Sequence, residues 1–162
     1  MAKQDMDMAV NETLDDAGSE SRVYELGFHL DPELPTEEVK KVYQEVRESV
    51  ADKGTIVVEG EPQKIQLAYT ISRQETSGRR DFDSAYFAWI VYEAVAPDHA
   101  EIITMASANK RIIRFIDLLT TKDSARHSAE MREISIKTQE RVEDSDEVAG
   151  AELDAALENV VV

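Results

Sequence analysis

The stretch from residue 64 to residue 93 contains the side chains whose chemistry most strongly suggests a binding partner. Its cations are Lys64, Arg73, Arg79 and Arg80, which lie on or beside a predicted turn. Lysine and arginine are the side chains that contact the phosphates of nucleic acids. They also keep exposed turns soluble, so the residue types alone leave both roles open for these cations. The chain's one tryptophan and three of its five tyrosines lie in the same stretch.

Catalytic and metal-binding patterns are missing from the sequence. The chain contains no cysteine, which excludes disulfides, thiolate catalysis and cysteine-ligated metals. No glycine-rich phosphate loop, HExxH motif or GxSxG motif occurs. The three histidines, His29, His99 and His127, fall on separate predicted elements. We therefore expect that the protein is not an enzyme, holds no metal and takes no small-molecule substrate.

The formal net charge of −16 is unevenly distributed along the chain. Residues 1–21 contain one lysine and six acidic residues, and residues 124–162 contain four basic and ten acidic residues. The segment between them, residues 22–123, contains 13 basic and 18 acidic residues. This balance argues against nonspecific binding to nucleic acid but permits a local basic patch. No apolar run approaches the length of a membrane span, so we expect a soluble, cytoplasmic protein.

These changes in composition predict three segments. Residues 1–21 are polar and acidic without sustained periodicity, and we expect a disordered N-terminal tail. Residues 22–123 contain the aromatic residues and form the predicted packed domain. Residues 124–162 form a predicted acidic C-terminal tail, mostly flexible and able to form a short helix.

A strand and a helix are predicted at the start of the domain. Residues 23–30 alternate as in a half-buried strand, with four apolar side chains on one face: Tyr24, Leu26, Phe28 and Leu30. A helix is predicted from Glu37 to Lys53, with Thr36 as its N-cap and Gly54 just after its end. Its apolar residues recur at helical spacing and form one stripe: Val39, Val42, Tyr43, Val46 and Val50.

Two more strands are predicted around the basic turn. A short strand over residues 55–59 reaches a bend at residues 60–62 (GEP) and resumes over residues 64–72. After the turn, a strand over residues 85–94 has apolar residues on both faces. A strand of that kind is usually buried on both sides, which predicts a central position in the sheet.

The last predicted elements are a second helix and a final strand. The helix starts at residues 96–98 and ends near Asn109, and the strand covers residues 112–119. The resulting order of strand, helix, strand, strand, helix and strand is typical of the ferredoxin-like α+β fold. We expect a four-stranded antiparallel sheet with both helices on one face and the other face open to a partner.

RNA-recognition modules share this topology and stack bases on aromatic residues of two strands. Here the third strand begins AYFAW over residues 85–89, without the basic-glycine pair that opens the RNA-recognition signature. Tyr86 and Trp89 also point to opposite faces of their strand. We therefore predict that Phe87 and Trp89 pack in a core and do not form a base-stacking platform.

Four short segments of the domain resemble one known family. Residues 66–71 (QLAYTI) resemble an R-L-A-Y-P-I segment, and residues 86–93 (YFAWIVYE) resemble a Y-F-L-W-Y-Q-V-E strand. Residues 109–114 (NKRIIR) resemble an N-x-x-V-x-R entry to the last strand, and residues 24–25 (YE) resemble the Y-E of the first strand. These segments and the order of elements are similar to those of the bacterial small-subunit ribosomal protein six family over residues 22–121.

The resemblance implies a structural constituent of the small (30S) ribosomal subunit, associated with the ribosome in the cytoplasm. Members of this family bind the central domain of 16S ribosomal RNA together with ribosomal protein eighteen, have no catalytic role and need no cofactor. Four RNA contacts are implied by position in the family's motifs: Arg22, Tyr24, Tyr69 and Arg114. The cations of the hairpin complete the predicted RNA-binding set: Lys64, Arg73, Arg79 and Arg80.

The residues alone also permit other roles. Tyr24 and Tyr69 can equally serve packing, and Arg114 can pair with Asp117 or Glu25 across the sheet. A second hypothesis is a ferredoxin-like protein-interaction or ligand-sensing domain outside the ribosome, homodimeric through its open sheet face. The net charge of −16 suits a partner other than nucleic acid.

Overall fold

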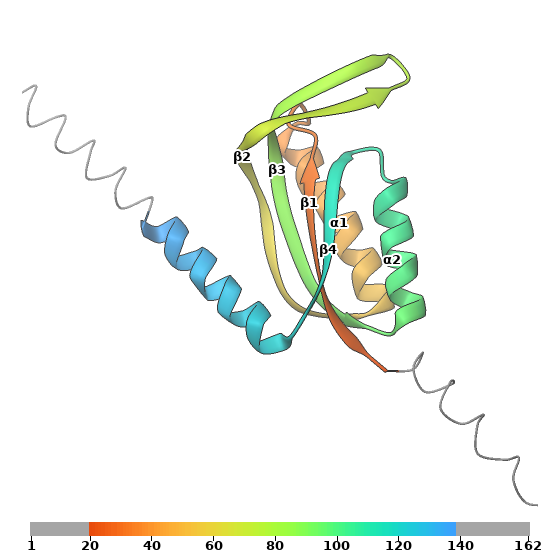
Figure 1. The fold of residues 1–162 in the computed structure, drawn as a ribbon, viewed down its shortest axis with the longest axis vertical. Coiled ribbons are helices and arrows are strands. Elements are labelled where there is room, and N and C mark those ends of the chain that lie inside the picture. The colour runs from red at the N-terminus through yellow and green to blue at the C-terminus, as the bar shows by residue number, and fades with distance from the viewer. Residues whose placement is uncertain (1–19, 139–162) are drawn as a thin grey trace, which may run out of the picture. The chain divides into compact units, whose positions relative to one another are not determined.

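The computed structural model describes residues 20–138 of the chain. Six elements follow one another in the order that the sequence predicts (Figure 1). They are β1 (Arg22–Leu30), α1 (Thr36–Lys53), β2 (Thr55–Glu75), β3 (Gly78–Ala94), α2 (Ala96–Ala108) and β4 (Ile112–Thr120). The predicted N-terminal tail lies almost entirely outside the described residues, as does the second half of the predicted C-terminal tail.

The four strands form one antiparallel sheet in the order β2-β3-β1-β4. Strand β3 therefore lies between β2 and β1, which confirms the central position predicted from its apolar residues on both faces. Helices α1 and α2 cover the same face of the sheet (Figure 1). The prediction of a ferredoxin-like α+β fold is confirmed.

The alternation of β1 places its apolar side chains beneath the two helices. Leu26, Phe28 and Leu30 have no exposed surface and belong to the main core cluster. Burial of each such side chain stabilises the fold by about 1.5–3 kcal/mol. Because β1 pairs with β3 on one side and β4 on the other, it fixes the register of both neighbouring strands.

Helix α1 buries the apolar stripe that its spacing predicts, and all five members are buried: Val39, Val42, Tyr43, Val46 and Val50. The predicted N-cap is wrong by one residue. Pro35 is the N-cap residue, Thr36 is already helical, and no side chain caps the helix. Glu37 and Glu38 instead place negative charge beside the unpaired N–H groups of the first turn.

Gly54 ends α1 because the chain passes close to β3 at this point. Its backbone is extended, with φ of −153°, and its N–H donates to the carbonyl oxygen of Val50 at 2.8 Å. A β-carbon at this position would lie 2.6 Å from the carbonyl oxygen of Glu93 and 3.2 Å from the β-carbon of Ala94. Glycine is therefore required here by space, not by a left-handed backbone.

Strands β2 and β3 are longer than the sequence predicts. Residues 73–84, expected to belong to an irregular turn, continue the antiparallel ladder up to the pair of Glu75 and Gly78. The turn itself contains only Thr76 and Ser77. Gly78 permits this tight turn because its φ is +124°, a value that other residues rarely adopt. The polar composition of the segment concealed the strands, because residues of these types are uncommon in strand interiors.

The bend predicted at residues 60–62 is an irregularity within one continuous strand. The register of β2 against β3 shifts there and at two further places, after Ile56 and after Gln66. Such bulges bend a strand and increase its twist. Beyond the third shift, residues 66–84 project past the rest of the sheet as a two-stranded arm (Figure 1).

Phe87 and Trp89 lie on the sheet face opposite α1 and α2, outside the main core cluster. The side chain of Trp89 is 9% exposed and covers Gly60, where a β-carbon would lie 2.1 Å from the indole nitrogen. The ring of Phe87 contacts His29, with ring centroids 5.4 Å apart. The predicted burial of Trp89 is confirmed, but these two residues do not pack beneath the helices.

A further helix covers residues 122–138, the last part of the chain that the structure describes. Most of it belongs to a second compact unit that starts at Arg126. Within this helix Lys137 pairs with Glu133 at 2.7 Å, and three apolar side chains are exposed: Met131, Ile134 and Ile136. None of the described helices is long and apolar enough to cross a membrane.

The close approach at Gly54 predicts the effect of a single added methyl group. We expect Gly54→Ala to lower the free energy of unfolding by about 1–3 kcal/mol, because the backbone of β3 must move away from the new β-carbon. Chemical denaturation measures this loss. Asp52→Ala, an exposed substitution in the same helical turn, is the control and should stay within about 0.5 kcal/mol of the unsubstituted protein. Equal stabilities for both variants would contradict the steric explanation.

Candidate nucleic-acid interface

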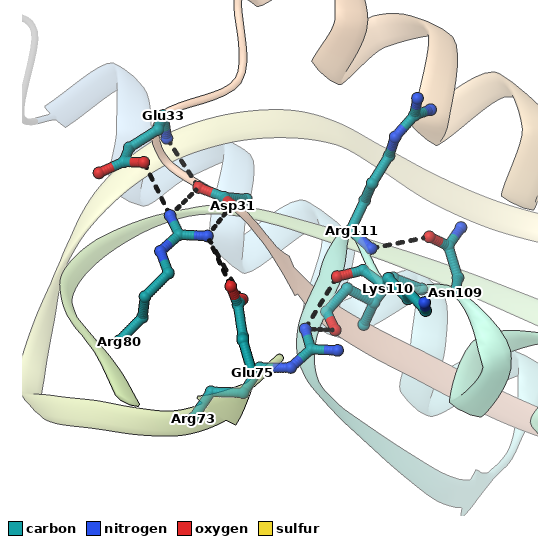
Figure 2. Close-up of polar contacts among 9 residues, drawn as sticks. Asp31, Glu33, Arg73, Glu75, Arg80, Asn109, Lys110 and Arg111 are labelled. Carbon is teal, nitrogen blue, oxygen red and sulfur yellow. Dashed lines mark hydrogen bonds and ion pairs between the residues drawn. The ribbon is translucent and has the colours of Figure 1, made fainter. Parts of the chain in front are cut away.

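Arg80 fixes the arm to the loop that follows β1. Its guanidinium contacts three carboxylates, those of Asp31 at 3.0 Å, Glu33 at 2.8 Å and Glu75 at 3.3 Å (Figure 2). The arginine side chain is 29% exposed and that of Asp31 is 18% exposed. The pKa of Arg80 is raised above its ordinary value, chiefly by the hydrogen bond to Asp31. Arg80 is thus paired with carboxylates of its own chain.

Asp31 joins the arm to a second loop as well. Its side chain accepts hydrogen bonds from Arg80 and from the N–H of Glu33, the latter at 2.9 Å. Its own backbone N–H donates to the carbonyl oxygen of Arg111 at 3.1 Å, in the turn between α2 and β4. The end of β1 is therefore the point where the arm and both neighbouring loops are connected.

Arg73 makes the second connection between the arm and the body of the domain. One terminal nitrogen of its guanidinium donates to the carbonyl oxygens of Lys110 at 2.9 Å and Ile112 at 3.0 Å (Figure 2). These contacts cross from β2 to the start of β4, which lie at opposite edges of the sheet. Arg73 holds the arm in place across the end of the sheet.

Arg79 is engaged within the arm. Its guanidinium donates to Asp81 at 3.2 Å and to the hydroxyl of Ser72 at 2.8 Å, and its side chain remains 68% exposed. The pKa of Asp81 is lowered by the hydrogen bond from Ser72 and then by that from Arg79. Exposed ion pairs of this kind contribute little to the stability of the fold. Arg79 can therefore leave Asp81 and bind another anion with only a small loss of stability.

Tyr69 and Arg114 form an exposed pair that again spans the sheet, from β2 to β4. The guanidinium lies over the tyrosine ring, 5.5 Å from its centroid, and it donates a hydrogen bond to the phenolic oxygen. Tyr69 is 62% exposed, so one face of a flat aromatic ring is available beside a positive charge. This combination suits a nucleotide, whose base can stack while its phosphate pairs with the cation.

The remaining predicted contacts lie elsewhere. Tyr24 stacks on His99 of α2, with ring centroids 3.7 Å apart, on the face that the helices cover. Arg22 is at the opposite end of β1 from the arm and pairs with Glu20 at 3.7 Å. Lys64 lies over the ring of Tyr86 at 5.8 Å. The structure thus brings together five of the eight predicted residues around the arm: Tyr69, Arg73, Arg79, Arg80 and Arg114.

Sequence reasoning missed two cations of this region, Lys110 and Arg111. Both lie in the turn between α2 and β4, and both are exposed. Among residues 20–138 neither side chain has an ion-pair or hydrogen-bond partner, although their carbonyl oxygens are engaged by Arg73 and Asp31. Arg111 extends away from the arm in Figure 2. The signal was present in the sequence, because both follow the predicted helix end at Asn109 and precede Arg114 by a few residues.

The neighbourhood of Arg114 also affects a histidine. His29 is paired with Arg114 across the two strands and contacts Phe87. Its pKa is lowered from the ordinary value, first by burial and second by the positive charge of Arg114. The neutral imidazole is therefore the form that the folded protein favours.

Other polar side chains of the domain connect the helices to the sheet. The Nε2 atom of His99 lies 2.7 Å from a carboxylate oxygen of Asp117, which connects α2 to β4. Arg47 donates to Glu59 at 2.8 Å, which connects α1 to β2. No group of three or more potential ligands in the described part of the chain is arranged to hold a metal ion.

The order of elements and the sheet topology define a ferredoxin-like α+β domain, and the arm places several exposed polar side chains at one end of its sheet. The family model of ribosomal protein S6 matches residues 23–118. The chain therefore belongs to the ribosomal protein S6 family, which is a family of ribosomal proteins and not of enzymes.

A solved structure supports the fold. The crystal structure of 30S ribosomal protein S6 from Thermotoga maritima is similar with a TM-score of 0.54 and 17% sequence identity. The match covers 70% of this chain and 99% of that chain. A comparison with curated proteins gives no match.

The lowered pKa of His29 predicts a loss of stability in mild acid. The unfolded chain takes up a proton near pH 6.5, whereas the folded protein does so only at lower pH, so stability falls as the pH drops below about 6.5. We expect His29→Gln to show a smaller stability difference between neutral and mildly acidic pH, measured by urea denaturation. Arg114→Gln should reduce this stability difference in part, because it removes the positive charge that is the second cause of the lowered pKa of His29. An unchanged pH dependence in His29→Gln would contradict the assignment.

The contacts of Arg80 predict that it restrains the arm. We expect Arg80→Gln to accelerate amide hydrogen exchange in residues 72–84 by roughly tenfold, because three carboxylates lose their shared cation. Exchange in α1 serves to correct for any global loss of stability. Arg79→Gln is the matched control and should change exchange by less than about twofold, since its pair is exposed. The same acceleration in both variants would show that Arg80 has no special role.

Proposed function

We propose that this protein is a structural constituent of the small (30S) ribosomal subunit. It binds the central domain of 16S ribosomal RNA together with ribosomal protein eighteen. The observation that carries the proposal is the family match over residues 23–118, which spans nearly all of the sheet and both helices. The protein acts in the cytoplasm as part of the ribosome and needs no cofactor.

The RNA-binding surface in this proposal is the end of the sheet where the arm meets β4. Tyr69 offers a stacking face and Arg114 a phosphate contact, and Lys110 and Arg111 extend the positive charge along the neighbouring turn. Arg79 contributes by exchanging Asp81 for a phosphate. Arg73 and Arg80 act differently, since their guanidinium groups already bind groups of the same chain, and they hold the arm in the position from which Tyr69 reaches Arg114.

The small number of available cations has a consequence for the partner protein. The domain has 18 acidic and 13 basic residues in positions 22–123, so long-range attraction to RNA is weak. A surface with about three or four phosphate contacts gives a shallow dependence of affinity on salt, with a slope of about −3 in a double-logarithmic plot. Tight binding therefore depends on ribosomal protein eighteen binding at the same time.

The test is binding of the full-length protein to a 16S central-domain fragment, with and without ribosomal protein eighteen, across a salt series. We expect tight binding with the partner present and a shallow salt slope. The double variant Tyr69→Ala and Arg114→Ala should lower the affinity by about 1–3 kcal/mol, and Arg114→Ala alone should reduce the salt slope by about 1. Lys40→Ala, an exposed cation on α1, is the control and should leave the affinity unchanged.

Two results would overturn the proposal in different ways. Binding that the double variant leaves intact would place the RNA elsewhere on the protein. No binding under any condition, together with a stable homodimer in light scattering, would favour a protein-interaction domain outside the ribosome.

A further inference from the structure

One side of β4 combines exposed apolar side chains with a cation. Arg114, Ile116 and Leu118 lie on the sheet face opposite α1 and α2. Ile116 is 57% exposed and Leu118 is 48% exposed. Asp117 is the one acidic residue of β4, and it points to the other face, where it contacts His99 at 2.7 Å. On the open face, β4 therefore presents apolar surface and positive charge without a carboxylate of its own.

The turn before β4 adds two cations at the Arg114 end of the strand. Lys110 and Arg111 are exposed, and no acidic partner for either lies among residues 20–138. Residues 109–122 contain four basic residues and one acidic residue, so this part of the acidic chain has a local net charge of +3. At the other end of β4, Lys122 is already paired with Glu93. We use the name β4 surface for five residues: Lys110, Arg111, Arg114, Ile116 and Leu118.

A surface of this composition fits an occupant that is both acidic and apolar. Residues 1–19 of the same chain have that composition, with five acidic residues and one lysine. Four larger apolar residues stand among the acids: Met6, Met8, Val10 and Leu14. The segment lies outside the described residues, and the family model begins only at residue 23. It therefore precedes the part of the chain that the family match covers.

The length of the segment suits the distance that it has to cover. It joins the domain at Arg22, the first residue of β1, and Arg114 pairs with His29, seven residues further along that strand. Seven residues of strand span about 23 Å, at roughly 3.3 Å per residue. Coils of 10–19 residues have a root-mean-square end-to-end distance of about 17–24 Å. A tether whose length matches the span gives the highest effective concentration, on the order of millimolar, so that even weak contacts are occupied.

We infer that residues 1–19 of this chain bind the β4 surface in the absence of RNA and thereby act as an internal competitor of RNA. Their carboxylates pair with Lys110, Arg111 and Arg114, and their apolar side chains cover the exposed aliphatic residues of β4. The contact itself does not depend on the proposed function. Its consequence for RNA rests on that function, because the same cations are the proposed phosphate contacts.

The competition favours RNA that uses the whole proposed site. RNA that offers phosphates alone has to displace carboxylates that already satisfy the cations. RNA that also stacks a base on Tyr69 gains a contact that the acidic segment does not replace. The segment thus acts against nonspecific binding more than against specific binding.

The first test is the rate at which an amine-reactive ester acylates Lys110 in the full-length protein without RNA. Lys40, an exposed lysine on α1, is the internal reference. The N-terminal variant changes five acids of the segment to amides: Asp5→Asn, Asp7→Asn, Glu12→Gln, Asp15→Asn and Asp16→Asn. We expect Lys110 to react about threefold faster relative to Lys40 in this variant, because carboxylates no longer hold its ammonium in the protonated form. At about 1 M salt, where the Debye length is roughly 3 Å, the unsubstituted protein should show a similar increase.

A C-terminal variant is the matched control, because it changes the net charge by the same amount: Glu143→Gln, Asp144→Asn, Asp146→Asn, Glu147→Gln and Glu152→Gln. The ratio of the two acylation rates should stay close to that of the unsubstituted protein. An unchanged ratio in the N-terminal variant, or an equal change in both variants, would overturn the inference. A change in the C-terminal variant alone would assign the surface to the other end of the chain and overturn it as well.

Dilution tests whether the segment belongs to the same molecule as the surface. We expect the acylation ratio to stay constant over a hundredfold range of protein concentration, with a monomer in light scattering. A ratio that rises on dilution, together with a dimer that dissociates, would assign the occupant to a second copy of the chain and overturn the inference.

The affinity for the 16S central-domain fragment tests the competition. We expect the N-terminal variant to bind about three- to tenfold more tightly than the C-terminal variant, because no segment has to be displaced. Equal affinities of the two variants would overturn the role as a competitor. If neither variant nor the unsubstituted protein binds the fragment, the proposed function fails, whereas the acylation ratio still decides whether the segment binds the β4 surface.

Discussion

The ion pair between Arg80 and Asp31 is the contact on which the candidate interface depends. It connects the arm to the end of β1, and the backbone of Asp31 continues the connection to the turn before β4. Arg73 reinforces the same arrangement from the other strand of the arm. With the arm fixed at both points, Tyr69 reaches Arg114 across the full width of the sheet. The exposed stacking face is thus a product of contacts made elsewhere.

The fold was predictable because its signals are local and redundant. The alternation of β1, the stripe of α1 and the apolar β3 each indicate one element, and their order leaves few alternatives to the ferredoxin-like topology. For the candidate site, the sequence predicted which residue types it contains but not which partners those residues contact. Arginines on a hairpin indicate a basic patch, but their partners lie far away in sequence. Asp31 is 49 residues from Arg80, and Lys110 is 37 residues from Arg73. No spacing rule connects such residues, so two predicted phosphate contacts proved to be engaged within the chain.

The acidic character of the chain changes how its cations can be used. Around Arg80 three carboxylates share one guanidinium, and Arg47, Lys53 and Arg79 are each paired with an acid as well. Lys110 and Arg111, two exposed cations for which no acidic partner lies within the described region, are neighbours in the turn before β4. Because the net charge of the chain is −16, long-range electrostatics do not attract RNA, and the proposed binding must depend on a few individually placed contacts.

The place of β1 in the sheet also has a consequence during synthesis of the chain. Both of its partners, β3 and β4, are translated after it, and β4 ends 90 residues beyond Leu30. At about 5–20 residues per second, roughly 5–18 s separate the end of β1 from the end of β4. During that interval Leu26 and Phe28 have no complete sheet to join, although α1 can already cover them. The strand at the centre of the folded domain is therefore the one that a nascent chain must protect for longest.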